Sequence, residues 1–252
     1  FPEYPQFESR DPAYAYYDKN SKYKGAYDRE RFYFEVDPFL MDSLDNFSIH
    51  NQELEGTFYS ADIFPPFKEK LTVRKDLSLG FRSTTPTEGR PLYGGTGTYY
   101  NVIDLSNQGL KGDGTFDFLA SSSKANDILF FPDSLQAHVN EFAMVEQQIG
   151  GVGFPNVSNT NVKVHWVPEE DEMTVKRTET LFNFFDNYAT LDGNLVLKST
   201  GLRGRGLFDW ADASLSSRDF EFGEFSVDAD TSELQIKAFD KSEIAFKLPN
   251  VN

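Results

Sequence analysis

Apolar and polar residues alternate along much of this chain, and this pattern limits the fold more than any other feature of the sequence. In "RFYFEV" (31–36), "VKVHWV" (162–167) and "LQIKAF" (234–239), apolar or aromatic residues recur at every second position. A period of two predicts β-strands with one buried face and one face in water. Further strand-like segments are 115–118, 128–131, 194–199 and 219–225.

Turn-forming residues separate these segments, as in "YGGTG" (93–97) and "NVSNTN" (156–161). Strands therefore recur at roughly ten-residue spacing, which favours a sandwich, a barrel or a solenoid. Only the segments 141–148 and 179–189 could form short helices, and both could equally be strands. We expect an all-β fold with few short helices.

The chain also resembles itself after a shift of 92 positions. The stretch "GLKGDGTFDF" (109–118) then lies on "GLRGRGLFDW" (201–210), and from Gly109 to Met144 12 of 36 positions are identical without a gap. A match of this kind indicates an internal repeat. Repeated units bury their faces against their neighbours. We therefore expect tandem β-repeats that form a solenoid or groove, or an elongated sandwich.

The repeat suggests how the chain is divided. Phe-Pro pairs at 64–65 and 154–155 lie near the start of two units, and the segment 42–49 resembles 133–144. We expect a segment cut from a longer array, so adjacent repeats of the same chain are the expected partners. The predicted parts are an irregular tyrosine-rich arm (1–30), the tail of a preceding partial repeat (31–62), a first β-repeat unit (63–152) and a second unit (153–252).

Charge and composition exclude several classes of protein. The net charge of -16 disfavours nucleic acid and anionic membranes as partners, because their phosphates would be repelled. No apolar run is long enough to form a transmembrane segment. The chain has 25 phenylalanines, enough apolar mass for a folded core, and no cysteine, so disulfides and thiolate chemistry are excluded. A cysteine-free, acidic, aromatic chain fits a bacterial cell envelope protein, in the periplasm or on the outer surface, or a secreted protein.

The glycine-rich stretch "GLRGRG" (201–206) invites a phosphate-loop interpretation, which the sequence argues against. A phosphate loop leads into a helix and carries a lysine followed by serine or threonine, and this stretch leads into "LFDW". Its repeat partner "GLKGDG" has Asp113 where Arg205 stands. We expect a structural corner or a tight approach of strands, where glycine is favoured.

No set of residues has the spacing of a catalytic or metal site. The three histidines, His50, His138 and His165, lie in different segments, and no Gly-x-Ser-x-Gly motif is present. The acidic runs 168–173 and 228–233 could bind calcium or could be solvated segments. We expect no enzyme, no catalytic residue, no cofactor and no metal.

Three residues remain as candidates for contact or modification. Trp166 is the candidate ligand contact, because exposed aromatic rings bind sugars and the sequence does not show which way this ring points. The tripeptide Asp-Ser-Leu occurs at 42–44 and 133–135 and matches an O-glycosylation acceptor pattern of Bacteroidota. Ser43 and Ser134 are therefore candidate O-glycosylation sites.

Several short markers resemble a class of very large, repetitive cell-envelope proteins of Bacteroidota without an established activity. The markers are Phe64-Pro65, "PLYGG" (91–95), "LSNQG" (105–109) and "FPDS" (131–134). A looser likeness is to AsmA-like and translocation-assembly-module proteins, whose β-grooves carry lipid. The resemblance implies a structural or spacer repeat module. The alternative is a module that binds a glycan, a lipid or another envelope protein.

Overall fold

The computed structural model describes residues 7–17, 27–41, 53–75 and 77–210, together with short strands at 219–222, 227–228, 231–232 and 236–238. Strands account for 66% and helix for 3%, and no helix in this described part reaches seven residues. The prediction of an all-β fold is confirmed. Both segments that could have been helices, 141–148 and 179–189, consist of strands and turns.

The chain forms two compact units. The first contains residues 1–114 and 129–132, and the second contains residues 115–128 and 133–252. The chain therefore passes into the second unit within β10 (Gly109–Phe118), returns within β11 (Ser121–Phe130), and enters the second unit again after Pro132.

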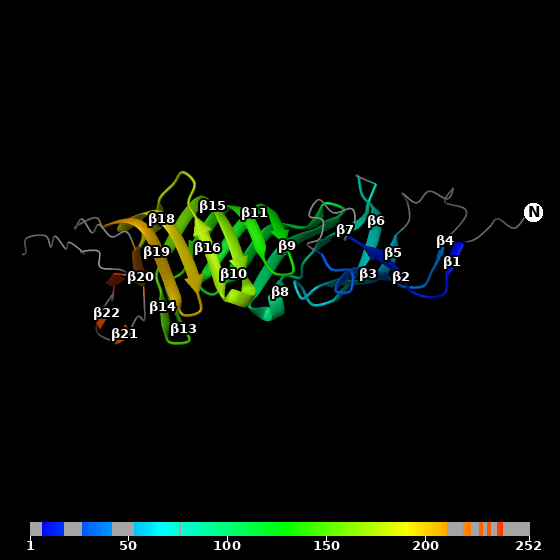
Figure 1. The fold of residues 1–252 in the computed structure, drawn as a ribbon, viewed down its shortest axis with the longest axis horizontal. Coiled ribbons are helices and arrows are strands. Elements are labelled where there is room, and N and C mark those ends of the chain that lie inside the picture. Colours follow the sequence, from blue (N-terminus) through cyan, green and yellow to red (C-terminus); the bar gives the residue numbers. More distant parts are fainter. Residues whose placement is uncertain are drawn as a thin grey trace, which may run out of the picture. The chain divides into compact units, whose positions relative to one another are not determined.

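Antiparallel pairing organises the first unit. Strands β2, β3, β5, β6, β7, β9 and β8 pair in that order, and β1 pairs separately with β4 (Figure 1). The bounds are β1 Phe7–Ser9, β2 Ala13–Tyr16, β3 Phe32–Val36, β4 Phe39–Met41, β5 Leu54–Ser60, β6 Phe67–Val73, β7 Leu79–Thr84, β8 Arg90–Leu92, the 3-10 turn η3 Tyr93–Gly95, and β9 Gly97–Ser106.

Phenylalanine rings fill the core of the first unit. Strand β3 alternates, so Phe32 and Phe34 are fully buried while Tyr33 and Glu35 face outward. Phe58 of β5 is also fully buried and makes edge-to-face contacts with Phe32, Phe67 and Phe81 at centroid distances of 5.2–5.6 Å. Such ring pairs add to the gain from burial alone.

A second aromatic cluster in this unit surrounds Tyr99. Its ring lies 5.9 Å from Phe64 and 5.2 Å from Phe130, and its hydroxyl donates to the carbonyl of Val102 at 2.6 Å. The buried hydroxyl of Tyr27 donates to the Phe130 carbonyl at 2.8 Å and accepts from the amide of Leu110 at 3.1 Å. Both phenols are therefore buried with their hydroxyls bonded to the backbone.

Burial of the phenols of Tyr99 and Tyr17 predicts a loss of stability at alkaline pH. Burial raises the pKa of Tyr99, with a smaller contribution from Asp113, and burial also raises that of Tyr17. An unfolded tyrosine loses its proton near pH 10, so the unfolded state holds fewer protons above that pH. The free energy of unfolding should therefore fall as pH rises above about 10, by up to about 1.4 kcal/mol per pH unit for each such group.

Urea unfolding between pH 8 and pH 11.5 measures this slope. The variant Tyr99→Phe should be less stable at pH 8, because it loses the bond to Val102, but its stability should fall less steeply above pH 10. Tyr188 is 43% exposed, so Tyr188→Phe should retain the parent slope. Equal slopes for the parent chain and Tyr99→Phe would contradict the assignment.

Antiparallel pairing also organises the second unit. Strands β12, β15, β16, β18, β19, β20 and β23 pair in that order, and β17 pairs with both β15 and β18. Two hairpins, β13–β14 and β21–β22, pair separately. The bounds are β12 Leu135–Met144, β13 Gln147–Ile149, β14 Val152–Phe154, β15 Val157–Val167, the 3-10 turn η4 Pro168–Glu170, β16 Glu172–Lys176, β17 Phe182–Phe184, β18 Ala189–Lys198, β19 Gly201–Trp210, β20 Asp219–Phe222, β21 Val227–Asp228, β22 Thr231–Ser232 and β23 Ile236–Ala238.

Strand pairing in the two units follows matching registers. In the first unit Phe81 of β7 pairs with Leu105 of β9, and in the second Met173 of β16 pairs with Leu197 of β18. The partners in the second unit each lie 92 positions further along the chain. The pairing of β8 with β9 and that of β17 with β18 differ by the same shift. The pairing of the preceding strand differs between the units, because β6 pairs with β7 in one register and β15 pairs with β16 in another.

A left-handed turn occupies matching positions in the two units. Residues 93–95 have φ values of 46°, 69° and 90°, and residues 185–187 have values of 51°, 55° and 71°. The first turn uses Tyr-Gly-Gly and the second uses Phe-Asp-Asn. Three successive residues with positive φ are uncommon outside glycine, so this turn is a specific backbone shape.

The glycine-rich stretches lie within strands and allow a close approach of backbones. A Cβ atom at Gly206 of β19 would lie 2.2 Å from the carbonyl oxygen of Asp192, and one at Gly114 of β10 would lie 2.0 Å from that of Tyr100. These two contacts also differ by 92 positions. The segment 201–206 is therefore part of a strand and not a corner, and the expected tight approach of strands is present.

Candidate binding surface

Four tyrosines lie on the outward face of three neighbouring strands in the first unit. Strands β2 (AYAY), β3 (FYFEV) and β5 (LEGTFYS) alternate, and the core takes up the phenylalanines of β3 and β5. Tyr16 pairs with Tyr33, and Tyr33 pairs with Tyr59. We call Tyr14, Tyr16, Tyr33 and Tyr59 the tyrosine surface. It includes part of the segment 1–30, where an irregular arm was expected and β1 and β2 are found.

The four rings lie close together. Tyr33 and Tyr59 are stacked with a centroid distance of 4.8 Å, and Tyr14 and Tyr16 are stacked at 6.2 Å. Tyr14 meets Tyr33 edge to face at 6.0 Å, and Tyr16 is tilted against Tyr33 at 6.5 Å. Cross-strand aromatic pairs stabilise a sheet, so the contacts between the rings restrain their side-chain conformations. Tyr14 is 50% exposed and Tyr16 40%, so part of each ring remains open to solvent.

Two charged residues complete a hollow beside these rings. The hollow has a volume of about 520 Å³ and is lined by Tyr14, Tyr16, Tyr33, Arg29 and Glu30. The guanidinium of Arg29 lies 4.2 Å from the centroid of the Tyr16 ring, which is a cation–π contact. Glu30 is exposed. The described part of the lining thus combines aromatic rings with one cation and one anion.

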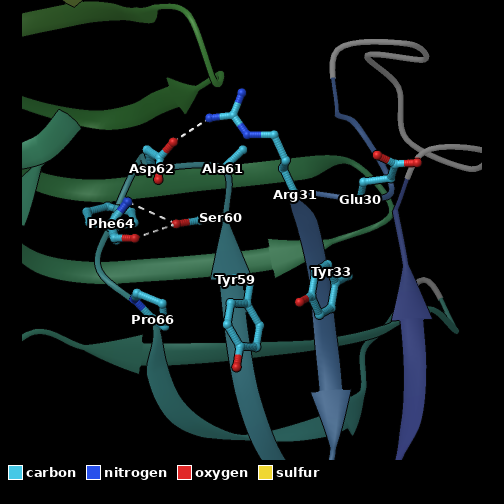
Figure 2. A pocket seen from close by; sticks show the side chains of 9 residues that line it. All are labelled: Glu30, Arg31, Tyr33, Tyr59, Ser60, Ala61, Asp62, Phe64 and Pro66. Atoms are coloured by element: carbon cyan, nitrogen blue, oxygen red, sulfur yellow. Dashed lines mark hydrogen bonds and ion pairs between the residues drawn. The ribbon is translucent and has the colours of Figure 1, made fainter.

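A smaller hollow of about 160 Å³ adjoins the first along β3 and β5. Glu30 and Tyr33 line both, and Figure 2 shows Tyr33 and Tyr59 side by side on neighbouring strands of this second hollow. On its far side Arg31 forms an ion pair with Asp62. The Ser60 hydroxyl donates to the Phe64 carbonyl at 3.0 Å and accepts from the Phe64 amide at 2.9 Å. These two bonds hold the backbone of this side of the hollow in place. The remaining lining residues are Ala61 and Pro66.

The electrostatic setting favours the neutral form of Tyr33. Partial burial raises the pKa of Tyr33, and the neighbouring Tyr59 and Glu35 add to this shift because a phenolate would be repelled there. A neutral phenol both donates and accepts hydrogen bonds. The surface therefore offers rings, hydroxyls, a guanidinium and a carboxylate, which suits the binding of a neutral polar ligand.

No family model, no curated protein and no solved structure matches this chain. The tyrosine surface therefore has to be interpreted from its own geometry.

The residues singled out from the sequence lie elsewhere. Trp166 of β15 is 0% exposed and packs against Phe118 at a centroid distance of 4.7 Å. A ligand resting on the outer surface would not reach its ring, because the alternation of β15 turns this position inward. Ser134 is buried, with its hydroxyl donating to the Asp133 carboxylate at 2.9 Å. Ser43 lies outside the described residues, and O-glycosylation of both serines stays a prediction.

The acidic run 168–173 forms turn η4 and the start of β16. Two of its four carboxylates make local contacts, since Asp171 accepts from the amide of Ser199 at 2.9 Å and Glu172 pairs with Lys198 at 3.0 Å. The residues that the structure describes contain no group of three or more His, Asp or Glu side chains suited to a metal ion. The same described part has no helix long and apolar enough to cross a membrane.

Sequence reasoning missed the tyrosine surface, although a signal was present. Alternating tyrosines occur in "AYAY" (13–16), and single outward tyrosines occur in "FYF" (32–34) and "TFYS" (57–60). Each signal is weak alone. It becomes informative only when these three strands are placed side by side.

Proposed function

We propose that this chain is a non-enzymatic structural module of a large bacterial cell-envelope protein, built from tandem units of one β-repeat. The proposal rests on two strand pairings that recur after a shift of 92 positions. The pairing of β7 with β9 recurs as that of β16 with β18, and the pairing of β8 with β9 recurs as that of β17 with β18. Two unrelated sheets would not share registers at two neighbouring strand pairings. The envelope part of the proposal rests on the sequence markers described above.

What recurs between the units is backbone shape, and what varies is surface chemistry. The left-handed turn and the close approach at Gly114 and Gly206 are shared. In contrast, Asp113 corresponds to the oppositely charged Arg205. A shared catalytic or binding site would require the same side chains, whereas a shared structural role requires only the same strand geometry. A binding function would add to such a scaffold rather than replace it.

Amide hydrogen exchange, followed by NMR on the full chain, tests the repeat. We expect the protected amides of β9 (97–106) to recur 92 positions further along in β18 (189–198), because the two strands sit in equivalent ladders. The β6–β7 and β15–β16 hairpins serve as an internal control, because their registers differ and their protection should differ too. Unrelated protection patterns in β9 and β18 would contradict the proposal. Turnover of chromogenic ester, glycoside or phosphate substrates by the purified chain would contradict its non-enzymatic part.

A further inference from the structure

The tyrosine surface shares two properties with small-ligand sites, its volume and its rigid support. The larger hollow falls within the range of about 300–1,000 Å³ that is usual for ligand pockets. Its aromatic lining comes from paired strands, so it is held on a rigid support. We propose that this hollow binds a neutral saccharide, with sugar rings packed against the tyrosines.

The aromatic part of the lining suits the apolar face of a sugar ring. A pyranose presents C–H groups on its faces, and these pack favourably on an aromatic π-surface. Tyr14 and Tyr16 keep a large part of their surface exposed, and each loses little conformational freedom on binding because neighbouring rings already restrain it. The second hollow shares Glu30 and Tyr33, so a saccharide longer than one unit can extend towards Tyr59.

The polar part of the lining suits hydroxyl groups. A sugar hydroxyl both donates and accepts, and neighbouring hydroxyls present pairs of such groups. The Arg29 guanidinium supplies donors, the Glu30 carboxylate supplies acceptors, and the phenol hydroxyls supply both. The mixture therefore matches a polyol better than a ligand that only donates or only accepts.

Charge selects a neutral ligand over a charged one. Among the lining residues that the structure describes, Arg29 and Glu30 offset each other, so these residues give the hollow no net preference for a cation or an anion. An anion would also be repelled by the net charge of -16. An organic cation would be repelled by the like charge of the Arg29 guanidinium in the lining. A proline-rich peptide needs slots between aromatic rings, whereas these rings contact one another.

Isothermal titration calorimetry on the full chain tests the proposal. The probes are six neutral hexasaccharides: β-1,4-glucose, β-1,3-glucose, α-1,4-glucose, β-1,4-mannose, β-1,4-xylose and β-1,4-N-acetylglucosamine. We expect saturable binding of at least one, with a dissociation constant in the millimolar range or tighter. Tyr16→Ala should weaken it about tenfold, and Tyr16→Phe should retain most of it, because the ring is kept.

Tyr188→Ala is the matched control, since Tyr188 is as exposed as Tyr16 but lies in the second unit. It should leave the affinity unchanged, and an unchanged urea midpoint for Tyr16→Ala would exclude unfolding as the cause of its loss. Failure of all six saccharides to bind would overturn the proposal. It would also be overturned by binding that Tyr16→Ala leaves intact, or by tyrosine-dependent binding of tetramethylammonium or a proline decapeptide without any saccharide binding.

Discussion

Replacing Gly206 by alanine should destabilise the second unit by about 3 kcal/mol. Two causes add at this position. Gly206 has a φ of 148°, which side-chain-bearing residues rarely adopt, and its Cβ would lie 2.2 Å from the Asp192 carbonyl oxygen and 2.6 Å from the Gly193 Cα atom. Neither neighbour is a side chain that can rotate away, so β18 and β19 would have to separate locally. Urea unfolding monitored by circular dichroism measures the loss.

Gly151→Ala separates the two causes. Gly151 also lies in the second unit and has a φ of 87°, but a Cβ atom there would meet nothing within 4 Å. It should therefore cost only about 1 kcal/mol, the strain of a left-handed backbone. Equal losses for Gly151→Ala and Gly206→Ala would show that the close approach of β18 and β19 is unimportant.

Replacing Phe58 by alanine should destabilise the first unit by about 3–5 kcal/mol. Phe58 is 0% exposed and contacts the rings of Phe32, Phe67 and Phe81 edge to face, so removal of its ring leaves a cavity among rigid neighbours. Aromatic rings held on three different strands cannot close such a cavity without moving the backbone. The shift of the urea midpoint, together with an unchanged slope, gives the free energy.

Thr57 provides the control for this variant, because it precedes Phe58 on β5 and faces the opposite side of the sheet. Thr57→Ala should change stability by less than about 0.5–1 kcal/mol, the scale of an outward cross-strand contact. Comparable losses for Thr57→Ala and Phe58→Ala would refute the view that the ring cluster dominates the stability of this unit.

Local patterns were enough to predict the strands. The alternation in 31–36 and 162–167 marks β3 and the end of β15, because a period of two requires only that one face be buried. The glycines of 201–206 were harder to interpret. Their sequence shows that backbone freedom is needed, but the reason, the Asp192 carbonyl beside Gly206, lies on another strand.

The candidate site depends on information that no local pattern contains. Whether an aromatic residue in a strand is buried depends on which face meets the core. The same alternation that buries Trp166 on β15 exposes Tyr16 on β2. The tyrosine surface also requires that β2, β3 and β5 be neighbours, although these strands are well separated along the chain. Pairing order, and not composition, creates the hollow.

The discontinuity of the two units has a consequence for synthesis on the ribosome. Residues 129–132 belong to the first unit, although residues 115–128 before them belong to the second. Two buried phenols of the first unit, Tyr27 and Tyr93, donate to the carbonyls of Phe130 and Phe131. A nascent chain that ends before these residues lacks the acceptors for both hydroxyls. The first unit therefore completes its folding only after part of the second has been translated, and the usual order of one domain after another does not apply.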